Sequence, residues 1–228
     1  MIQFHTLEKS STEDILEVFK SSFSDYSVPF HLTLPQLKAK IVNDSVRPEL
    51  SVGAFENGKL IGFILHGYDT INGKITVYNA GTGIIPEKRG NGLSAKLYDH
   101  ILPLLKAENT NSIRLEVLAE NVPALKTYEK IGFKSVRNFD CYKGAIQIVN
   151  QDKGYEIKEL ESFDWQNIIQ FWDWEPSWQN SITAVENLRQ TNHTIGIFEG
   201  EQLLGYLVYN PLCKRIQQFG IKKEYRRK

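Results

Sequence analysis

"KRGNGLSAKLYDHILPLL", residues 88–105, places two glycines and two basic residues at the start of an amphipathic helix. An apolar stripe follows Gly92, made up of Leu93, Leu97, Ile101, Leu104 and Leu105. Pro103 lies inside this pattern and removes a helical hydrogen bond, so the last turn should be kinked or shortened. Small residues let backbone N–H groups at a helix N-terminus approach an anion, and Lys88 and Arg89 add positive charge. The stretch therefore predicts a pyrophosphate-binding turn or simply a tight strand-to-helix connection.

Two common phosphate-binding loops do not fit this stretch. A P-loop needs Gly-Lys-Ser/Thr immediately before its helix, and that ending is absent here. A dinucleotide fingerprint would need another glycine after Gly81 and Gly83, where the chain instead has Pro86 three residues on.

The elements around the stretch alternate between strand and helix patterns. "SSTEDILEVFKSSF" predicts a helix in which Ser10 and Glu13 are spaced as a capping box, and "TLPQLKAKIVND" predicts a second, shorter one. Strands are expected at residues 50–55, 59–68, 74–85 and 112–118, and a further helix at 121–133 that closes at Gly132. Asn57 and Gly58 suit a tight hairpin between the first two strands.

The composition excludes several classes of protein. The 228 residues are 41% hydrophobic and 24% charged, with zero formal net charge, so there is no global basic field for nucleic acid. No apolar run approaches the ~20 residues that span a bilayer, and the N-terminus lacks the apolar core of a signal peptide. Cys141 and Cys213 are far apart and the five histidines are scattered. We expect a cytoplasmic protein with no metal site and no nucleic-acid or membrane partner.

A second stretch, "LAENVPALKTYEKIGF", indicates a family of proteins when it is combined with the first. The two resemble the GNAT superfamily of acetyl-CoA-dependent N-acyltransferases, whose motif Arg/Gln-x-x-Gly-x-Gly/Ala is met by Arg89 and Gly92, with Ser94 departing from the last Gly/Ala. About thirty residues later many members carry a further pattern, matched here by Asn121, Ala124, Tyr128, Glu129, Lys130, Gly132 and Phe133. The resemblance covers residues 1 to about 145. It implies an α/β fold with a mixed, strongly bent sheet, helices on both faces and a splay between two central strands that takes the pantetheine arm.

The resemblance also implies where acetyl-CoA, the cosubstrate, should lie. The expected coenzyme contacts are Ile84, Ile85, Lys88, Arg89, Gly90, Asn91, Gly92, Leu93, Ser94 and Asn121. A primary amine would attack the acetyl thioester directly, and Tyr128 is the proposed acid that protonates the leaving thiolate. By spacing alone, Tyr128 after Ala124 and Leu125 would equally suit a core aromatic.

A base is needed because an alkylamine is almost wholly protonated at neutral pH. Glu116 is our candidate, since it should point away from Leu115 and Val117 on the strand beside the coenzyme, although alternation alone also places a glutamate outward. Glu120 is the rival, and it would equally favour the N-terminus of the next helix. The acceptor remains open between small-molecule amines and peptide or protein amines.

The second part of the sequence repeats the pattern of the first. "TIGIFEGEQLLGYLVYN" repeats "LSVGAFENGKLIGFILHG", and "FGIKKEYRRK" repeats "TGIIPEKRGN" so that Arg226 falls where Arg89 falls. We expect residues 1–147 to form the GNAT acetyltransferase domain and residues 148–228 a partial GNAT-like repeat that stops before its own coenzyme loop. The second part should supply no coenzyme contacts. It should pack against the first domain or against a second copy of the chain, as a homodimer. Four tryptophans, Trp165, Trp172, Trp174 and Trp178, indicate either helix packing or an aromatic wall near a cleft.

Two other function classes stay open at this point. A catalytically silent acyl-CoA-binding or regulatory module would keep the glycine loop yet tolerate loss of Tyr128, and a pure interaction protein would not need the coenzyme.

Overall fold

The computed structural model of the chain describes residues 1–25, 32–145 and 154–226. It divides into two compact units, Met1–Ser135 and Val136–Lys228. The expected boundary between residues 147 and 148 lies outside the described residues. Within the described part of the chain, none of the helices is long and apolar enough to cross a membrane.

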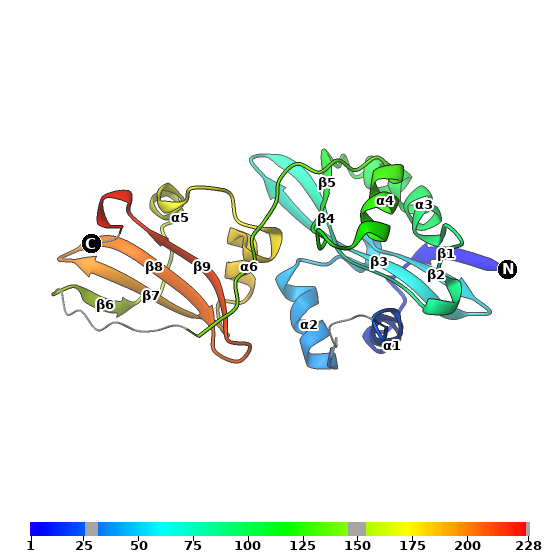
Figure 1. Ribbon diagram of the computed structural model, residues 1–228, viewed down its shortest axis with the longest axis horizontal. Helices are drawn as coiled ribbons and strands as arrows, with labels where there is room; N and C mark the ends of the chain where they lie inside the picture. The colour runs from blue at the N-terminus through cyan, green and yellow to red at the C-terminus, as the bar shows by residue number, and fades with distance from the viewer. Residues whose placement is uncertain (26–31, 146–153, 227–228) are drawn as a thin grey trace. The chain divides into compact units, whose positions relative to one another are not determined.

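The first unit is a five-stranded sheet in the order β1-β2-β3-β4-β5, antiparallel except for the parallel pair β4–β5. Its strands are β1 Ile2–Thr6, β2 Val52–Glu56, β3 Lys59–Ile71, β4 Lys74–Ile84 and β5 Ser112–Leu115. Its helices are α1 Thr12–Ser22, α2 Leu34–Asn43, α3 Leu93–Ala107 and α4 Val122–Ile131, with short 3-10 turns at Pro48–Leu50 and Pro86–Lys88. Figure 1 shows α1 and α2 on one face of this sheet and α3 and α4 on the other. This arrangement confirms the predicted fold class.

The core of the first unit lies between the sheet and α3. Leu97, Tyr98 and Ile101 of α3 pack in one buried cluster with Val52 and Ile64 of the sheet. The apolar stripe read from the sequence is thus the face of α3 that covers the sheet. The helix N-terminus is thereby held at the end of β4.

Three details differ from the sequence expectation. The N-cap of α1 is Ser11, whose hydroxyl accepts the Asp14 N–H over 3.0 Å, so the capping box placed at Ser10 and Glu13 was wrong by one residue. Helix α3 continues through Pro103 to Ala107, so the expected shortening was also wrong. The carbonyl that Pro103 leaves without a donor belongs to Asp99, which is exposed, so water can hydrogen-bond to it. Strand β1 was missed, although Ile2 and Phe4 alternate toward the core.

The second unit is a four-stranded antiparallel sheet in the order β6-β7-β8-β9. Its strands are β6 Glu156–Glu159, β7 His193–Glu199, β8 Gln202–Asn210 and β9 Arg215–Ile221. Its helices are α5 Trp165–Ile168 and α6 Ile182–Asn187, with 3-10 turns at Ile169–Phe171, Trp178–Asn180 and Lys223–Tyr225. Trp165 and Trp172 pack against its core and Trp178 is buried, whereas Trp174 is 71% exposed. Three of the four tryptophans therefore serve packing.

The second sheet repeats the first four strands in register as well as in order. Gly205 lies opposite Ile221 as Gly62 lies opposite Ile84. A bulge between Ile197 and Phe198 repeats the one between Ala54 and Phe55. The four described strands of the second unit therefore match β1 to β4 of the first unit in order and in register.

Candidate active site

Strands β4 and β5 of the first unit part at Asn79. Strand β5 pairs with β4 only from Thr76 to Asn79, whereas β4 continues to Ile84. Within the described residues no strand pairs with this edge of β4 beyond Asn79. Backbone N–H and C=O groups along such an edge can bind an extended ligand as a further strand would. This geometry resembles the splay that the family resemblance implies, but in the described sheet β5 is an edge strand and not a central one.

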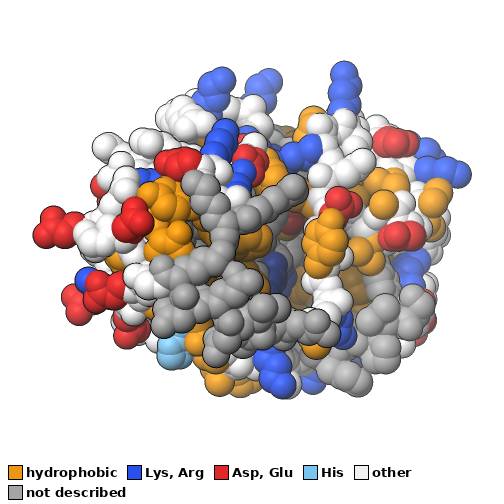
Figure 2. Space-filling model, turned by 60° about the vertical axis from the view of Figure 1, so that its left-hand side comes forward, with side chains coloured by type: hydrophobic (Ala, Val, Ile, Leu, Met, Phe, Trp, Pro, Cys, Tyr) orange, Lys and Arg blue, Asp and Glu red, His pale blue; other side chains and the backbone are white. Residues whose placement is uncertain are grey.

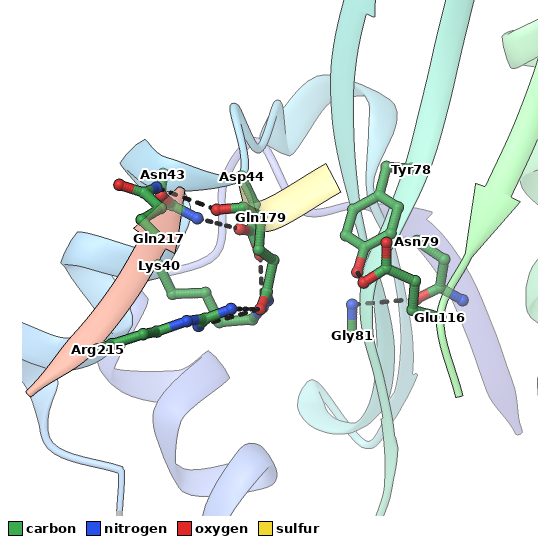
Figure 3. A network of polar contacts seen from close by, with 10 residues as sticks. All are labelled: Lys40, Asn43, Asp44, Tyr78, Asn79, Gly81, Glu116, Gln179, Arg215 and Gln217. Atoms are coloured by element: carbon green, nitrogen blue, oxygen red, sulfur yellow. Dashed lines mark hydrogen bonds and ion pairs between the residues drawn. The ribbon is translucent and has the colours of Figure 1, made fainter. Parts of the chain in front are cut away.

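A β-bulge marks the point of parting, and the Asn79 side chain holds it. The register of β3 and β4 shifts between Leu65 and His66, so that one residue of β4, Ala80, lies between the paired Asn79 and Gly81. Asn79 Oδ1 accepts the Gly81 N–H over 3.0 Å, as Figure 3 shows. Its Nδ2 donates to Tyr98 Oη on α3 over 2.7 Å. Because both residues are buried, this contact fixes β4 to α3 beside the open edge.

The open part of β4 carries glycine where it faces α1. A Cβ at Gly83 would lie 2.8 Å from the Phe63 ring and 2.9 Å from Ser22 Oγ, closer than real Cβ atoms come. A Cβ at Gly81 would meet the Phe19 ring at 3.4 Å. Because these two residues have no side chain, β4 can lie close to α1.

The loop after β4 presents a helix N-terminus without a side-chain cap. Gly90 (φ 77°) and Gly92 (φ 68°) both have left-handed backbone conformations, and a Cβ at either would meet nothing within 4 Å. Gly92 is the N-cap of the 15-residue α3, and no side chain caps this end. The first backbone N–H groups of α3 therefore point out of the helix with an open approach, which suits phosphate oxygens. This helix end therefore fits the pyrophosphate of the coenzyme that the family resemblance implies.

The two basic residues of the loop already have carboxylate partners. Lys88 Nζ lies 2.6 Å from Glu56 Oε2, and the hydrogen bond from Lys88 lowers the pKa of Glu56. Arg89 Nη1 lies 2.6 Å from Asp25 Oδ2, and its hydrogen bond lowers the pKa of Asp25. Arg89 also donates to the carbonyls of Ser22 and Ile84. Arg89 thus connects the end of β4 to the end of α1. Because Lys88 and Arg89 are paired with carboxylates, the N-terminus of α3 is the main positive feature of the loop for phosphate, and the two basic side chains contribute less than the sequence suggested.

Arg226 makes the same set of contacts in the second unit. It donates to the carbonyls of Ile221 and Phe171 and forms an ion pair with Asp173 at 2.8 Å. This matches the contacts of Arg89 with Ile84, Ser22 and Asp25. In both units, therefore, the arginine anchors a strand end internally. Arg227 and Lys228 lie outside the described residues.

Tyr128 lies on α4, on the same face of the sheet as α3. Its half-buried ring packs against the cluster that contains Tyr98, and it meets Phe133 edge-on at 5.7 Å. Phe133 in turn meets Tyr98 edge-on at 5.5 Å. Asn121 caps α4 by accepting the Ala124 N–H over 3.2 Å, and Gly132 (φ 111°) ends the helix. The three aromatic rings fix the direction of α4 and hence the position of Tyr128.

Glu116 lies just past the end of β5, not within the strand as expected. It is exposed, and its Oε2 accepts a hydrogen bond from Tyr78 Oη over 3.4 Å. Figure 3 shows the two side chains pointing toward one another. Tyr78 alternates with Val77 and Asn79, which face α3, so Glu116 and Tyr128 lie on opposite sides of the splay. Glu120, the rival base, is also exposed.

The remaining expected coenzyme residues gather at the same end of β4. Ile84 and Ile85 are half-buried against the α3 cluster, and Leu93 is part of it. Asn91 is exposed and donates to the Arg89 carbonyl over 3.2 Å. Ser94, in the first turn of α3, is half-buried. Asn121, the last of the expected coenzyme residues, is the N-cap of α4.

Asn79 and Tyr98 are the site residues that sequence reasoning missed. In the sequence, Asn79 interrupts a run of strand-forming residues, and Tyr98 adds a hydroxyl group to an otherwise apolar helix face. Together these two features could have indicated a buried polar pair. In the described part of the chain, no cluster of three or more potential ligands suits a metal ion. Figure 2 shows acidic and basic side chains both distributed over the face in view, in line with the zero net charge.

Comparisons with known proteins agree with this geometry. A sequence model described as the Acetyltransferase (GNAT) family matches residues 12–133, which include the open β4 edge, the glycine loop and Tyr128. The chain therefore belongs to the GNAT acetyltransferase family.

Among individual relatives, N-alpha-acetyltransferase 30 of Schizosaccharomyces pombe is 33% identical over 87 residues, which are 38% of this chain and 58% of that protein. A crystal structure of the NatC complex bound to Gag peptide and CoA aligns with TM-score 0.50 and 25% identity, over 60% of this chain and 86% of the other. A possible acetyltransferase from Clostridium difficile 630 aligns with TM-score 0.50 and 17% identity, over 65% of this chain and 99% of the other, and so shows the shared fold alone.

Proposed function

We propose that the first unit binds acetyl-CoA and transfers its acetyl group to a primary amine. The observation that carries the proposal is the alignment of two backbone features, the unpaired edge of β4 and the uncapped N-terminus of α3. The edge offers alternating donors and acceptors to the amides of a pantetheine arm, and the helix end offers N–H groups to a pyrophosphate.

The coenzyme, when bound, supplies an acetyl group activated as a thioester. Tyr128 Oη holds a proton for the sulfur that would leave, because a phenol is neutral at pH 7 and can donate. We propose Glu116 Oε2 as the acceptor of the amine proton, and its exposed carboxylate on the other side of the splay supports this role. Tyr78 orients this carboxylate through their hydrogen bond.

For the acceptor, we propose the N-terminal amine of a peptide as the first class to test. The S. pombe relative is named as an N-alpha-acetyltransferase, and the NatC neighbour is described with a bound peptide. Small-molecule amines remain the comparison arm of the experiment.

The test is an acetyl-transfer assay with acetyl-CoA and a panel of short peptides with free or blocked N-termini and of small amines. We expect Tyr128→Phe to lower kcat by about 10²-fold while coenzyme affinity is retained, because only proton donation is lost. Tyr68→Phe is the matched control, since Tyr68 also packs half-buried against the same core. Unchanged turnover of Tyr128→Phe would remove the acid role. Coenzyme binding without transfer to any amine would indicate a silent acyl-CoA-binding module.

A further inference from the structure

The sheet of the second unit is apolar on both faces. One face carries a buried cluster formed with the helical segments, which includes Ile168, Phe171, Tyr206 and Val208. The register places seven other apolar side chains together on the opposite face, which we call the open face: Ile157, Ile195, Ile197, Leu207, Ile216, Phe219 and Ile221.

The side chains of the open face are accessible. Phe219 is 69% exposed and Ile157 68%, and Ile216 and Ile221 are 43% and 40% exposed. A contiguous set of large apolar side chains at this exposure marks an interaction surface and not an ordinary protein exterior.

The first unit shows what covers the equivalent face. The pair Ile195–Leu207 of the second sheet corresponds to the pair Val52–Ile64 of the first. Likewise, Ile197 and Ile221 lie on either side of Gly205, as Ala54 and Ile84 lie on either side of Gly62. Val52, Ala54 and Ile64 are 0% exposed, because α3 lies on them. The covering side chains Leu93, Leu97, Ile101 and Leu105 recur every four residues along α3.

Two substitutions between the repeats make the open face more apolar than its counterpart. By register, Ile216 occupies the position of Asn79, because it pairs with Tyr209 as Asn79 pairs with His66. Phe219 then corresponds to Thr82, since it pairs with Leu207 as Thr82 pairs with Ile64. Thr82 and Asn79, the residue that holds the bulge in the first unit, are thus replaced by side chains suited to apolar packing.

We propose that the open face binds an amphipathic α-helix of a protein, seated as α3 is seated on the first sheet, with apolar residues at four-residue intervals. Such a helix would bury Phe219 and Ile221 beneath its apolar stripe and leave its polar side in water. This interaction is separate from the acetyl-transfer site and does not depend on coenzyme binding.

The probe is a fluorescent peptide with the sequence of residues 90–108, titrated with the full chain. An isolated helix of this length is marginal in water, so binding should raise both its fluorescence anisotropy and its helicity. We expect saturable binding that Phe219→Asp and Ile157→Asp each weaken by about tenfold or more, equivalent to losing about 1.4 kcal/mol. Both variants change exposed positions and should fold, which thermal unfolding verifies.

Two controls make the test specific. Leu212→Asp changes a side chain that is 86% exposed between β8 and β9 but off the open face, and it should leave binding unchanged. A peptide in which the positions of Leu97 and Ile101 carry aspartate should not bind. The proposal is overturned by any of three results: no saturable binding up to about 1 mM peptide, equal binding by Phe219→Asp, or a dimer of the chain that Phe219→Asp dissociates while the peptide fails to bind.

Discussion

Asn79 Nδ2 donates a hydrogen bond to Tyr98 Oη over 2.7 Å, and this contact joins the end of the β4–β5 pairing to helix α3. The orientation of the amide is fixed, because its Oδ1 must accept the Gly81 N–H. Burial raises the pKa of the Tyr98 phenol, so it is a neutral acceptor at physiological pH. One side chain therefore holds both the bulge at the parting of β4 and β5 and the helix whose N-terminus we propose as the coenzyme site.

The first prediction is that Asn79 and Tyr98 are energetically coupled. Asn79→Ala should lower the free energy of unfolding by about 1–3 kcal/mol, because it leaves buried polar groups unsatisfied. In the double-mutant cycle with Tyr98→Phe, we expect a coupling energy of about 1 kcal/mol, measured by urea denaturation. Additive effects within about 0.3 kcal/mol would show that the contact stabilises nothing.

A second prediction concerns the base. Glu116→Gln should lower kcat/KM by roughly 10²-fold, because the amide cannot take a proton from the amine. The loss should be smaller toward high pH, where more of the amine is already neutral. Glu120→Gln is the matched control. If Glu120→Gln is the damaging variant and Glu116→Gln is active, the base role belongs to Glu120.

A third prediction follows from His66, which is fully buried on β3. Its Nδ1 donates to the Leu50 carbonyl over 2.7 Å, and within the described residues its Nε2 has no hydrogen-bond partner. Burial lowers the pKa of His66 from 6.5 to about 4, so the folded state keeps it neutral where the unfolded chain takes up a proton. Its contribution to stability is complete above pH 6.5 and is lost as the pH falls toward 4.

When the pH is lowered from 7 to 5, the free energy of unfolding should therefore fall by about 2 kcal/mol because of this histidine. His66→Asn should flatten this dependence, whereas His100→Asn, at an exposed position on α3, should leave it unchanged. Equal slopes for wild type and His66→Asn in urea denaturation at the two pH values would contradict the assignment.

The sequence predicted those parts of the site that depend on neighbours along the chain. The glycine loop, the stripe of α3 and the capped helix bearing Tyr128 each lie within about a dozen residues, so spacing alone places them. The internal repeat likewise placed Arg226 beside a strand end as Arg89 is placed. The contacts that it did not predict join residues far apart in the chain, such as Arg89 with Asp25 and Asn79 with Tyr98. Strand β1 was missed because only five residues carry its alternation, and its partner β2 lies beyond two helices.

The central claim is that the loop at Gly92 binds acetyl-CoA, and thermal unfolding with and without the coenzyme tests it most directly. At about 100 times its Kd, acetyl-CoA should add about 2.7 kcal/mol to the stability of the wild type. Gly92→Val should abolish this gain, because a branched side chain at φ 68° disturbs the helix N-terminus and blocks the approach to it. Gly73→Val, at φ 72° in the β3–β4 hairpin, carries the same backbone strain away from the loop and should keep the gain. No stabilisation of the wild type by millimolar acetyl-CoA, or an equal gain in Gly92→Val, would contradict the account.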